Sequence, residues 1–293
     1  MYDRILVGVD GSDESKRAAR YALELGSRVD ASVTAFHVVE KRALNLARGS
    51  GEATELRQER AAVLAEIEAV AEEVGHPVDD ELAEGDPATR LTERASDADL
   101  VVLGRQGISG LKRRLLGGVT EQVLHHSDVP VFVVPDEAES FAADRLLVPT
   151  DGSENAELAL PHAAELARID GGRVDLLNVI DLDAAGGAFD AGGLEPEFLD
   201  RLEARGREAV EDAAEEVQSL APDAEVRTAV ERAAPSSSAA AGIRSYVEEH
   251  DTDAVVMGSH GRGNLKRTLL GSVASSVLRT VDVPVLVAVR EER

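Results

Sequence analysis

Short, nearly continuous apolar segments alternate along this chain with longer segments in which apolar and charged residues follow a helical period. The apolar segments are predicted strands, and in the first half they lie at Arg4–Val9, Ser32–Val39, Val78–Ala83, Asp99–Leu103 and Val131–Val134. The periodic segments are predicted helices, at Asp13–Val29, Ala53–Val74, Pro87–Ser96 and Gly118–His126. Strands that are apolar on both faces and separated by helices are typical of a parallel sheet covered by helices on both sides.

The second half repeats this order of elements. Its predicted strands lie at Arg145–Pro149, Arg173–Ile180, Ala224–Val230, Asp253–Met257 and Pro284–Val289. Pro161 falls inside the first predicted helix of this half and is expected to bend it, because proline has no amide proton and its ring meets the preceding turn. The predicted fold is therefore α/β, with two doubly wound parallel sheets in tandem.

Individual residues show the same repeat. Asp10-Gly11-Ser12 recurs as Asp151-Gly152-Ser153, an offset of 141, whereas Gly104 recurs as Gly258, an offset of 154. The added residues of the second half are predicted to form surface insertions, which cost little free energy to lengthen. We place the insertions at Ala184–Gly193 and Ser236–Ala241, the first domain at residues 1–137, a linker at 138–144 and the second domain at 145–293.

Each half carries glycines at a fixed spacing between its fourth strand and the next helix. Gly104 and Gly107 are followed after nine residues by Gly117-Gly118, and Gly258 and Gly261 are followed after nine residues by Gly271-Ser272. Glycine lets the backbone approach a ligand closely, and the first amides of a helix attract anions. The pattern therefore indicates a cradle for a triphosphate in each half.

The spacer between the glycine pairs is basic in both halves, although the protein as a whole is acidic. It contains Lys112-Arg113-Arg114 in the first half and Lys266-Arg267 in the second. These cations either attract phosphate or a partner, or only balance the local charge in a solvated loop.

Other candidate residues lie where the strands end, because ligands of doubly wound sheets bind beyond the carboxyl ends of the strands. Asp10 and Asp151 follow the first strands, and Val38 and Val179 lie at the ends of the second strands. Together with Gly104 and Gly258, they are expected to face one crevice in each half. Either aspartate could accept a hydrogen bond from a ribose hydroxyl or help to hold hydrated Mg²⁺.

Several other motifs are weak or absent. The first strand-to-helix turns match neither the dinucleotide pattern nor the P-loop pattern. Ser12 and Ser153 are interpreted as helix caps rather than nucleophiles, because each precedes an acidic first turn. The adjacent His125 and His126 point in different directions on a helix, which disfavours a metal pair. His260 lies between two glycines and could either contact a ligand or be exposed in a loop.

Composition narrows the setting of the protein. Its 56 acidic and 31 basic residues give a formal charge of −25. The excess of carboxylates, with arginine preferred to lysine, favours a protein kept soluble in very high salt over an ordinary acidic cytosolic protein. This charge disfavours nucleic-acid binding, and the absence of cysteine excludes disulfides and thiolate metal sites. With no signal pattern and no apolar run near the ~20 residues of a membrane helix, we expect a soluble cytoplasmic protein.

These residues together resemble the universal stress protein family, in a tandem form and over nearly the whole chain. The family's ATP-binding pattern G-x2-G-x9-G-[ST] corresponds to Gly258, Gly261, Gly271 and Ser272. The resemblance implies two Rossmann-like domains, similar to adenine nucleotide alpha hydrolases, that bind ATP with Mg²⁺. In the first half it implies nucleotide contacts at Asp10, Val38, Leu103, Gly104, Gly107, Gly117, Gly118, Val119 and Thr120. In the second half it implies contacts at Thr150, Asp151, Val179, Met257, Gly258, His260, Gly261, Gly271, Ser272 and Val273.

The chain departs from the family pattern at a few positions. Gly118 replaces the usual serine or threonine, and Ala274 stands where a threonine hydroxyl is common. The second half has no counterpart of Gly85-Asp86-Pro87.

Three functions remain open at this stage. The first is a stress regulator that responds to bound ATP without turning it over quickly. The second is an ATP-hydrolysing or nucleotidyl-transferring enzyme, and the third is an interaction module that has lost nucleotide binding. The family also implies that the final strands of the two halves pair, giving an intrachain pseudo-dimer, and a homodimer of whole chains is a further expectation.

Overall fold

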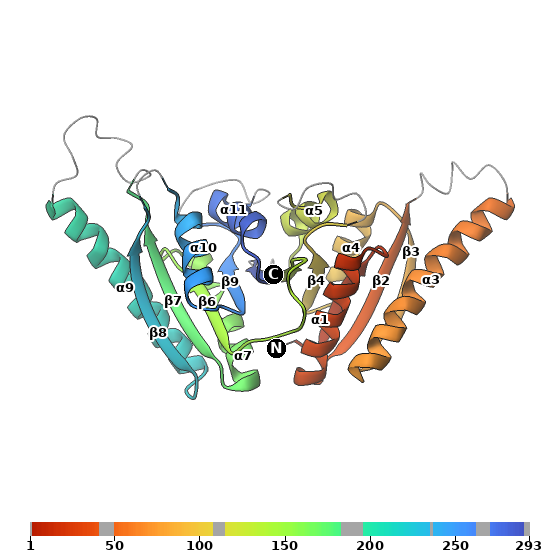
Figure 1. The fold of residues 1–293 in the computed structure, drawn as a ribbon, viewed down its shortest axis with the longest axis horizontal. Coiled ribbons are helices and arrows are strands. Elements are labelled where there is room, and N and C mark those ends of the chain that lie inside the picture. Colours follow the sequence, from red (N-terminus) through yellow and green to blue (C-terminus); the bar gives the residue numbers. More distant parts are fainter. Residues whose placement is uncertain are drawn as a thin grey trace. The chain divides into compact units, whose positions relative to one another are not determined.

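The computed structural model describes residues 2–40, 50–107, 115–182, 196–234, 237–261 and 270–289. The chain divides into two compact units, the first ending at Phe141 and the second beginning at Ala142. This division falls inside the segment 138–144 that the sequence indicates as a linker. Each unit is an α/β layer structure with a parallel sheet, as predicted (Figure 1).

The first unit contains the strands of the sheet order β3-β2-β1-β4-β5. They are β1 (Arg4–Val9), β2 (Ser32–Glu40), β3 (Asp79–Gly85), β4 (Leu100–Gly104) and β5 (Val131–Val134). The helices are α1 (Asp13–Val29), α3 (Ser50–Val74), α4 (Pro87–Ala95) and α5 (Gly118–His126). Every neighbouring pair of these strands is parallel.

The second unit has the corresponding order β8-β7-β6-β9-β10, again with parallel neighbours. Its strands are β6 (Arg145–Pro149), β7 (Arg173–Ile180), β8 (Glu225–Arg232), β9 (Ala254–Gly258) and β10 (Val285–Ala288). Its helices are α6 (Glu154–Glu157), α7 (Leu160–Asp170), α9 (Pro196–Leu220), α10 (Ala239–Glu249) and α11 (Ser272–Thr280).

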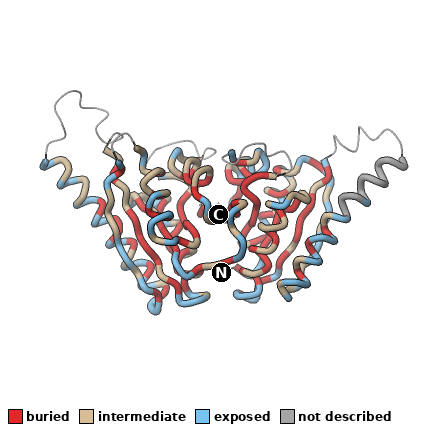
Figure 2. The backbone as a smooth tube through the Cα atoms, in the orientation of Figure 1, coloured by how far each residue is buried: buried red, intermediate tan, exposed pale blue. Residues whose placement is uncertain are grey.

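Helices cover both faces of each sheet. In the first unit α1 packs against α3 and α4 packs against α5, and in the second unit α7 packs against α9 and α10 against α11. The central strands are consequently buried on both sides, which Figure 2 shows as red tubes between helices with exposed outer faces. Every residue of β4 and β9 is buried, which explains why their sequences are apolar without alternation.

The helix boundaries follow local sequence signals. Ser12 caps α1 by accepting a hydrogen bond from Ser15 N, and Ser153 caps α6 by accepting one from Ala156 N, so the capping prediction is confirmed. The helix α1 ends at Val29, and its C-cap residue Asp30 has left-handed backbone angles (φ 57°, ψ 37°) and donates its amide proton to Gly26 O.

The prediction of one helix bent at Pro161 is wrong in detail, because the structure contains two helices. The short helix α6 ends at Glu157, and α7 begins at Leu160 with Pro161 in its first turn. Proline cannot donate to the carbonyl four residues earlier, and its ring would clash with that carbonyl. The first turn of a new helix needs no such bond, so the chain restarts there.

No described helix has the length and apolar character that a membrane crossing requires. The described residues also contain no group of three or more His, Asp or Glu side chains arranged to hold a metal ion. The basic spacers at 112–114 and 266–267 and the insertion at 184–193 lie outside the described residues.

Candidate functional site

Each unit contains a cavity where the order of its strands reverses. In the first unit the chain runs outward from β1 to β2 and β3, and then returns to place β4 on the other side of β1. The second unit does the same around β6, with β7 on one side and β9 on the other. This reversal leaves room beyond the carboxyl ends of the strands, where doubly wound sheets bind ligands.

The first-unit cavity has a volume of about 420 Å³ and the second-unit cavity about 250 Å³. The first brings together all nine residues that the sequence places at its site, namely Asp10, Val38, Leu103, Gly104, Gly107, Gly117, Gly118, Val119 and Thr120. The second brings together all ten of its candidates, namely Thr150, Asp151, Val179, Met257, Gly258, His260, Gly261, Gly271, Ser272 and Val273.

The aspartate that follows the first strand accepts a hydrogen bond from the amide two residues later in both units. Asp10 Oδ1 accepts hydrogen bonds from Ser12 N (2.9 Å) and Ser12 Oγ (2.6 Å). Asp151 Oδ1 accepts one from Ser153 N (3.1 Å). These bonds fix the position of the carboxylate at the mouth of the strand-to-helix turn.

The second oxygen of each aspartate lies against a glycine of the cradle. A Cβ atom on Gly107 would overlap Asp10 Oδ2, and a Cβ atom on Gly261 would lie only 2.6 Å from Asp151 Oδ2. The glycine therefore lets the loop after β4 or β9 approach the carboxylate. A ligand in this corner would meet backbone and carboxylate at once.

The helices α5 and α11 begin at the cavities without a side-chain cap. Gly117 and Gly271 occupy their N-cap positions and make no side-chain hydrogen bond. By contrast, α1, α4, α6 and α10 each have a capping side chain. The first amides of a helix have no partner within the helix, so those of α5 and α11 can donate to an anion in the cavity.

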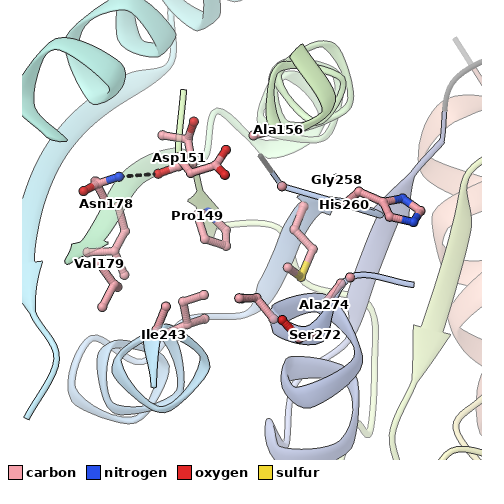
Figure 3. Close-up of a pocket in the computed structure, with 17 residues that line it drawn as sticks. Pro149, Asp151, Ala156, Asn178, Val179, Ile243, Gly258, His260, Ser272 and Ala274 are labelled. Carbon is pink, nitrogen blue, oxygen red and sulfur yellow. Dashed lines mark hydrogen bonds between the residues drawn. The ribbon is translucent and has the colours of Figure 1, made fainter. Parts of the chain in front are cut away.

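Sequence reasoning missed a pair of polar side chains on the second strands. His37 Nδ1 lies 2.6 Å from Val9 O, and Asn178 Nδ2 donates to Thr150 O at 2.8 Å (Figure 3). In each unit the second strand thus fixes the carbonyl just before the site aspartate. The two positions are related by the offset of 141, and a polar residue at the same place near the end of both second strands was the signal that could have found them.

Thr120 at the start of α5 makes a hydrogen bond within the protein that Ala274, at the corresponding position of α11, cannot make. Thr120 Oγ1 donates to Gly104 O at 2.9 Å, so its proton serves the protein itself. Ala274, which lines the second cavity, cannot make this bond. The departure from the family pattern at Ala274 therefore removes an internal hydrogen bond.

The helix that closes the apolar side of each cavity is capped by different residues. Asp86 caps α4 and accepts from Thr89 N (2.9 Å) and Thr89 Oγ1 (2.8 Å), which lowers the pKa of the Asp86 carboxyl. In the second unit Ser238 caps α10 instead. The missing counterpart of Gly85-Asp86-Pro87 is thus replaced by a different N-cap.

Figure 3 shows how the second cavity divides into two ends. Val179 and Ile243 lie on one side, from β7 and α10, whereas Ser272 and Ala274 lie at the start of α11. The ring of His260 is directed away from Asp151 and Ser272, and its Nδ1 lies 3.0 Å from Ser259 Oγ. The cavity therefore has an apolar end and an end rich in backbone amides.

Comparison with known proteins places the chain in a family. Residues 1–135 and 143–290 each match the universal stress protein family. The chain belongs to this family. A universal stress protein of Mycolicibacterium smegmatis is 32% identical to this chain in an alignment of 295 positions, which covers 97% of this chain and 96% of the relative. The match therefore extends over nearly the full length of both proteins.

Other relatives are consistent with this assignment. Universal stress protein MJ0531 of Methanocaldococcus jannaschii is 39% identical in an alignment of 140 positions, which covers 46% of this chain and 82% of that protein. A universal stress protein structure from Archaeoglobus fulgidus superposes with a TM-score of 0.70 at 24% identity and covers 99% of this chain and 97% of its own. The latter likeness shows that the two chains share a fold.

Proposed function

We propose that both units of this universal stress protein bind ATP together with Mg²⁺, and that the bound nucleotide regulates the protein. The observation that carries the proposal is the uncapped start of α5 and α11 at a cavity lined by glycines. A helix start without a capping side chain leaves its amides to donate to a ligand, and a triphosphate accepts many such bonds.

The opposite end of each cavity suits a flat aromatic base. Val38 and Leu91 line it in the first unit, and Val179 and Ile243 in the second. Aliphatic side chains can pack on both faces of a purine, while backbone groups at the strand end supply its hydrogen bonds. The ribose would then lie near Asp10 or Asp151, between the base and the phosphates.

The residues present fit a nucleotide-bound Mg²⁺ better than a metal held by the protein alone. The described residues include no cluster of three metal-ligating side chains, but each cavity has one carboxylate beside its cradle, Asp10 or Asp151. Mg²⁺ is commonly held by one or two carboxylates, the phosphates of its nucleotide and water. Bound in this way, Mg²⁺ would neutralise part of the phosphate charge.

We favour a regulator over a fast enzyme because the cavities offer few groups for proton transfer. Rapid hydrolysis needs a positioned base and extra charge stabilisation at the γ-phosphate. Asp151 is already held by Ser153 N, and His260 is turned away from the phosphate end. The acidic, cysteine-free composition is compatible with a cytoplasmic protein of a high-salt cell.

The proposal can be tested on the purified full-length chain in molar KCl. Mass spectrometry of molecules released on denaturation should identify an adenine nucleotide. Saturating ATP with Mg²⁺ should raise the melting temperature of emptied protein by several degrees, since a ligand at 100 times its Kd stabilises the folded state by about 2.7 kcal/mol. GTP should have a smaller effect. A folded, emptied protein whose melting temperature does not respond to millimolar ATP would instead support an interaction module.

A further inference from the structure

One arginine of the first unit is buried within the loop that forms the phosphate cradle. Arg105 lies between Gly104 and Gly107, and its side chain is only 3% exposed. Its Nη2 contacts Asp136 Oδ1 at 2.6 Å and Glu137 Oε2 at 2.9 Å. Both carboxylates belong to the segment that follows β5, through which the chain leaves the first unit.

The backbone of the same residue holds the cradle together. Arg105 N donates to Val134 O at 2.8 Å, and Arg105 O accepts from Gly117 N at 2.8 Å. The residue thus connects the loop after β4, the N-cap of α5 and the end of β5. A phosphate group bound to the amides of this cradle would restrain both bonds.

The two carboxylates form an unusual pair around the guanidinium. The hydrogen bond from Glu137 and the charge of Arg105 hold the pKa of Asp136 below its ordinary value. Burial raises the pKa of Glu137, and its hydrogen bond with Asp136 raises it further. The guanidinium and carboxylates depend on one another, because a buried charge that loses its partner is strongly unfavourable.

The segment is attached to the first unit again a few residues later. Phe141 N donates to Glu24 Oε2 at 2.6 Å. The Phe141 ring packs edge-on against the Tyr21 ring, with the ring centroids 5.1 Å apart. Both partners lie on α1, whose first turn is itself connected to the cradle, since Gln106 N donates to Glu14 Oε2 at 2.6 Å. Residues 135–141 are therefore connected to the cradle at Arg105 and, through α1, at Gln106.

The second unit lacks this connection at the equivalent position. Ser259 replaces Arg105 and keeps the backbone bonds, with its N donating to Ala288 O (3.1 Å) and its O accepting from Gly271 N (2.9 Å). Its hydroxyl lies 3.0 Å from His260 Nδ1. The same backbone bonds therefore form with a serine at this position, so they do not require the arginine side chain.

We propose that Arg105 is a positioning residue that transmits nucleotide occupancy of the first cavity to residues 136–141. The inference rests on the proposed function, because it requires a nucleotide in that cavity. A bound triphosphate fixes the loop of Gly104 and Gly107, the loop fixes the guanidinium, and the guanidinium orders Asp136 and Glu137. Occupancy of the first cavity thereby controls the order of the segment that leads to the second unit.

Hydrogen exchange of the full chain, with and without ATP and Mg²⁺, tests this proposal. The Gly271→Val background removes binding in the second unit, so any response comes from the first. ATP should slow exchange of the amides of 136–141 by about fivefold or more, since a segment ordered by a ligand opens less often. Arg105→Ser, which installs the residue of the second unit, should retain ATP binding by calorimetry but reduce this slowing to less than about twofold. Ser259→Ala serves as the matched control and should leave the response intact.

The outcomes separate the coupling from the proposed function. A purely structural role for Arg105 would raise exchange of 136–141 equally with and without ATP, leaving the ratio unchanged, and would overturn the coupling. An undiminished ratio in a folded Asp136→Asn, Glu137→Gln double variant would overturn it also, and this variant serves if Arg105→Ser does not fold. Failure of the parent chain to bind ATP by calorimetry would overturn the proposed function and the coupling together.

Discussion

The two cavities of this chain have the same backbone and different linings. Both have an aspartate that contacts a glycine, an uncapped helix start and a strand-end carbonyl held by a polar side chain. Yet Gly8 in the first corresponds to Pro149 in the second, and Gly118 corresponds to Ser272. A phosphate cradle built from amides tolerates such changes, because its donors do not depend on side-chain identity.

The difference in lining accompanies a difference in size. Gly8 contributes no side chain to the larger cavity of about 420 Å³, whereas Pro149 places a ring at the edge of the smaller one of about 250 Å³. A Cβ atom at Gly8 would lie 2.5 Å from Leu103 Cδ2, so a side chain there would require Leu103 to move. We therefore expect the two units to bind nucleotide by the same phosphate contacts but with different affinities.

The largest expected effect comes from blocking one cradle at a time. Gly271→Val places a branched side chain where even a Cβ atom would lie 3.2 Å from Ser259 O and 3.3 Å from His260 Cα. Gly117→Val does the same against Arg105 O and Gln106 Cα, both at 3.3 Å. Each change should lower affinity in its own unit by about 100-fold or more, because a phosphate and the side chain compete for one space.

Calorimetry should show a stoichiometry that falls from two nucleotides per chain to one in either single variant, and to none in the double variant. Circular dichroism melting of each variant controls for folding. Two sites that persist in the Gly271→Val chain would show that the cradle of the second unit has been placed wrongly.

The next effect concerns stability and belongs to the second unit alone. Burial lowers the pKa of His162 on α7 to about 4, whereas the equivalent residue of α1 is Tyr21. In the unfolded chain His162 binds a proton near pH 6.5, whereas in the folded chain it does so only near pH 4. The free energy of unfolding therefore falls as the pH is lowered from 6.5 to about 4. At pH 5 the loss should be about 2 kcal/mol, or a few degrees of melting temperature.

His162→Phe should remove this dependence, because phenylalanine has no proton to bind. The check is the change in melting temperature from pH 7 to pH 5, for the parent chain and the variant. Hydrogen exchange in β6 and β7 should report the acid loss, while exchange in β1 and β2 serves as the internal control. Equal acid sensitivity of the two chains would assign it to other groups.

The third effect tests the aspartates that follow the first strands. Asp10→Asn and Asp151→Asn keep an oxygen that can accept from Ser12 N or Ser153 N but remove the charge beside the cradle. Each should weaken binding of ATP with Mg²⁺ by about tenfold in its own unit, the usual size of a lost charge-assisted hydrogen bond. The comparison is made by calorimetry in the chain whose other cradle is blocked, and binding without Mg²⁺ should change less.

Much of this architecture follows from the sequence because its causes are local. The apolar segments predict the strands to within about two residues, and the acidic turn after Ser12 predicts its cap. The internal repeat aligns the strand ends, so the aspartates, valines and glycines of each cavity can be named in advance. These features depend on short periods and on the rule that ligands bind beyond the strand ends.

The features that the sequence did not predict depend on tertiary contacts. Arg105 reaches carboxylates 31 and 32 positions away, and no local pattern connects them. Residue type alone does not say whether the chain bends or restarts at Pro161, and in the structure it restarts there as α7. The roles of His37 and Asn178 needed the carbonyl opposite each of them on the neighbouring strand.

A smaller effect should follow from exchanging one residue between the cavities. Nothing lies within 4 Å of a Cβ atom on Gly118, so Gly118→Ser should fit without displacing the backbone and bring the hydroxyl found at Ser272. It should strengthen ATP binding in the first unit by about fivefold, and Ser272→Gly should weaken binding in the second by a similar factor. Calorimetry in chains with the other cradle blocked measures both. If neither exchange alters affinity, the serine does not contact phosphate and the difference between the cavities lies at the base end.

The smallest expected effect is on turnover, where the cavities should remain alike although only the second has a histidine in its glycine loop. His260 Nδ1 is engaged with Ser259 Oγ at 3.0 Å, and the ring is directed away from Asp151 and Ser272 (Figure 3). A general base must come within about 3 Å of the attacking water, directly or through one water, and this ring does not face the phosphate end. We therefore expect ATP hydrolysis well below ~1 s⁻¹, with no measurable change in His260→Ala. Phosphate release from the full chain in molar KCl, with either cradle blocked in turn, would show equal slow rates for both units. A rate typical of enzymes that depends on His260 or Asp151 would make the second unit an ATPase, and the two cavities would then differ in chemistry as well as in affinity.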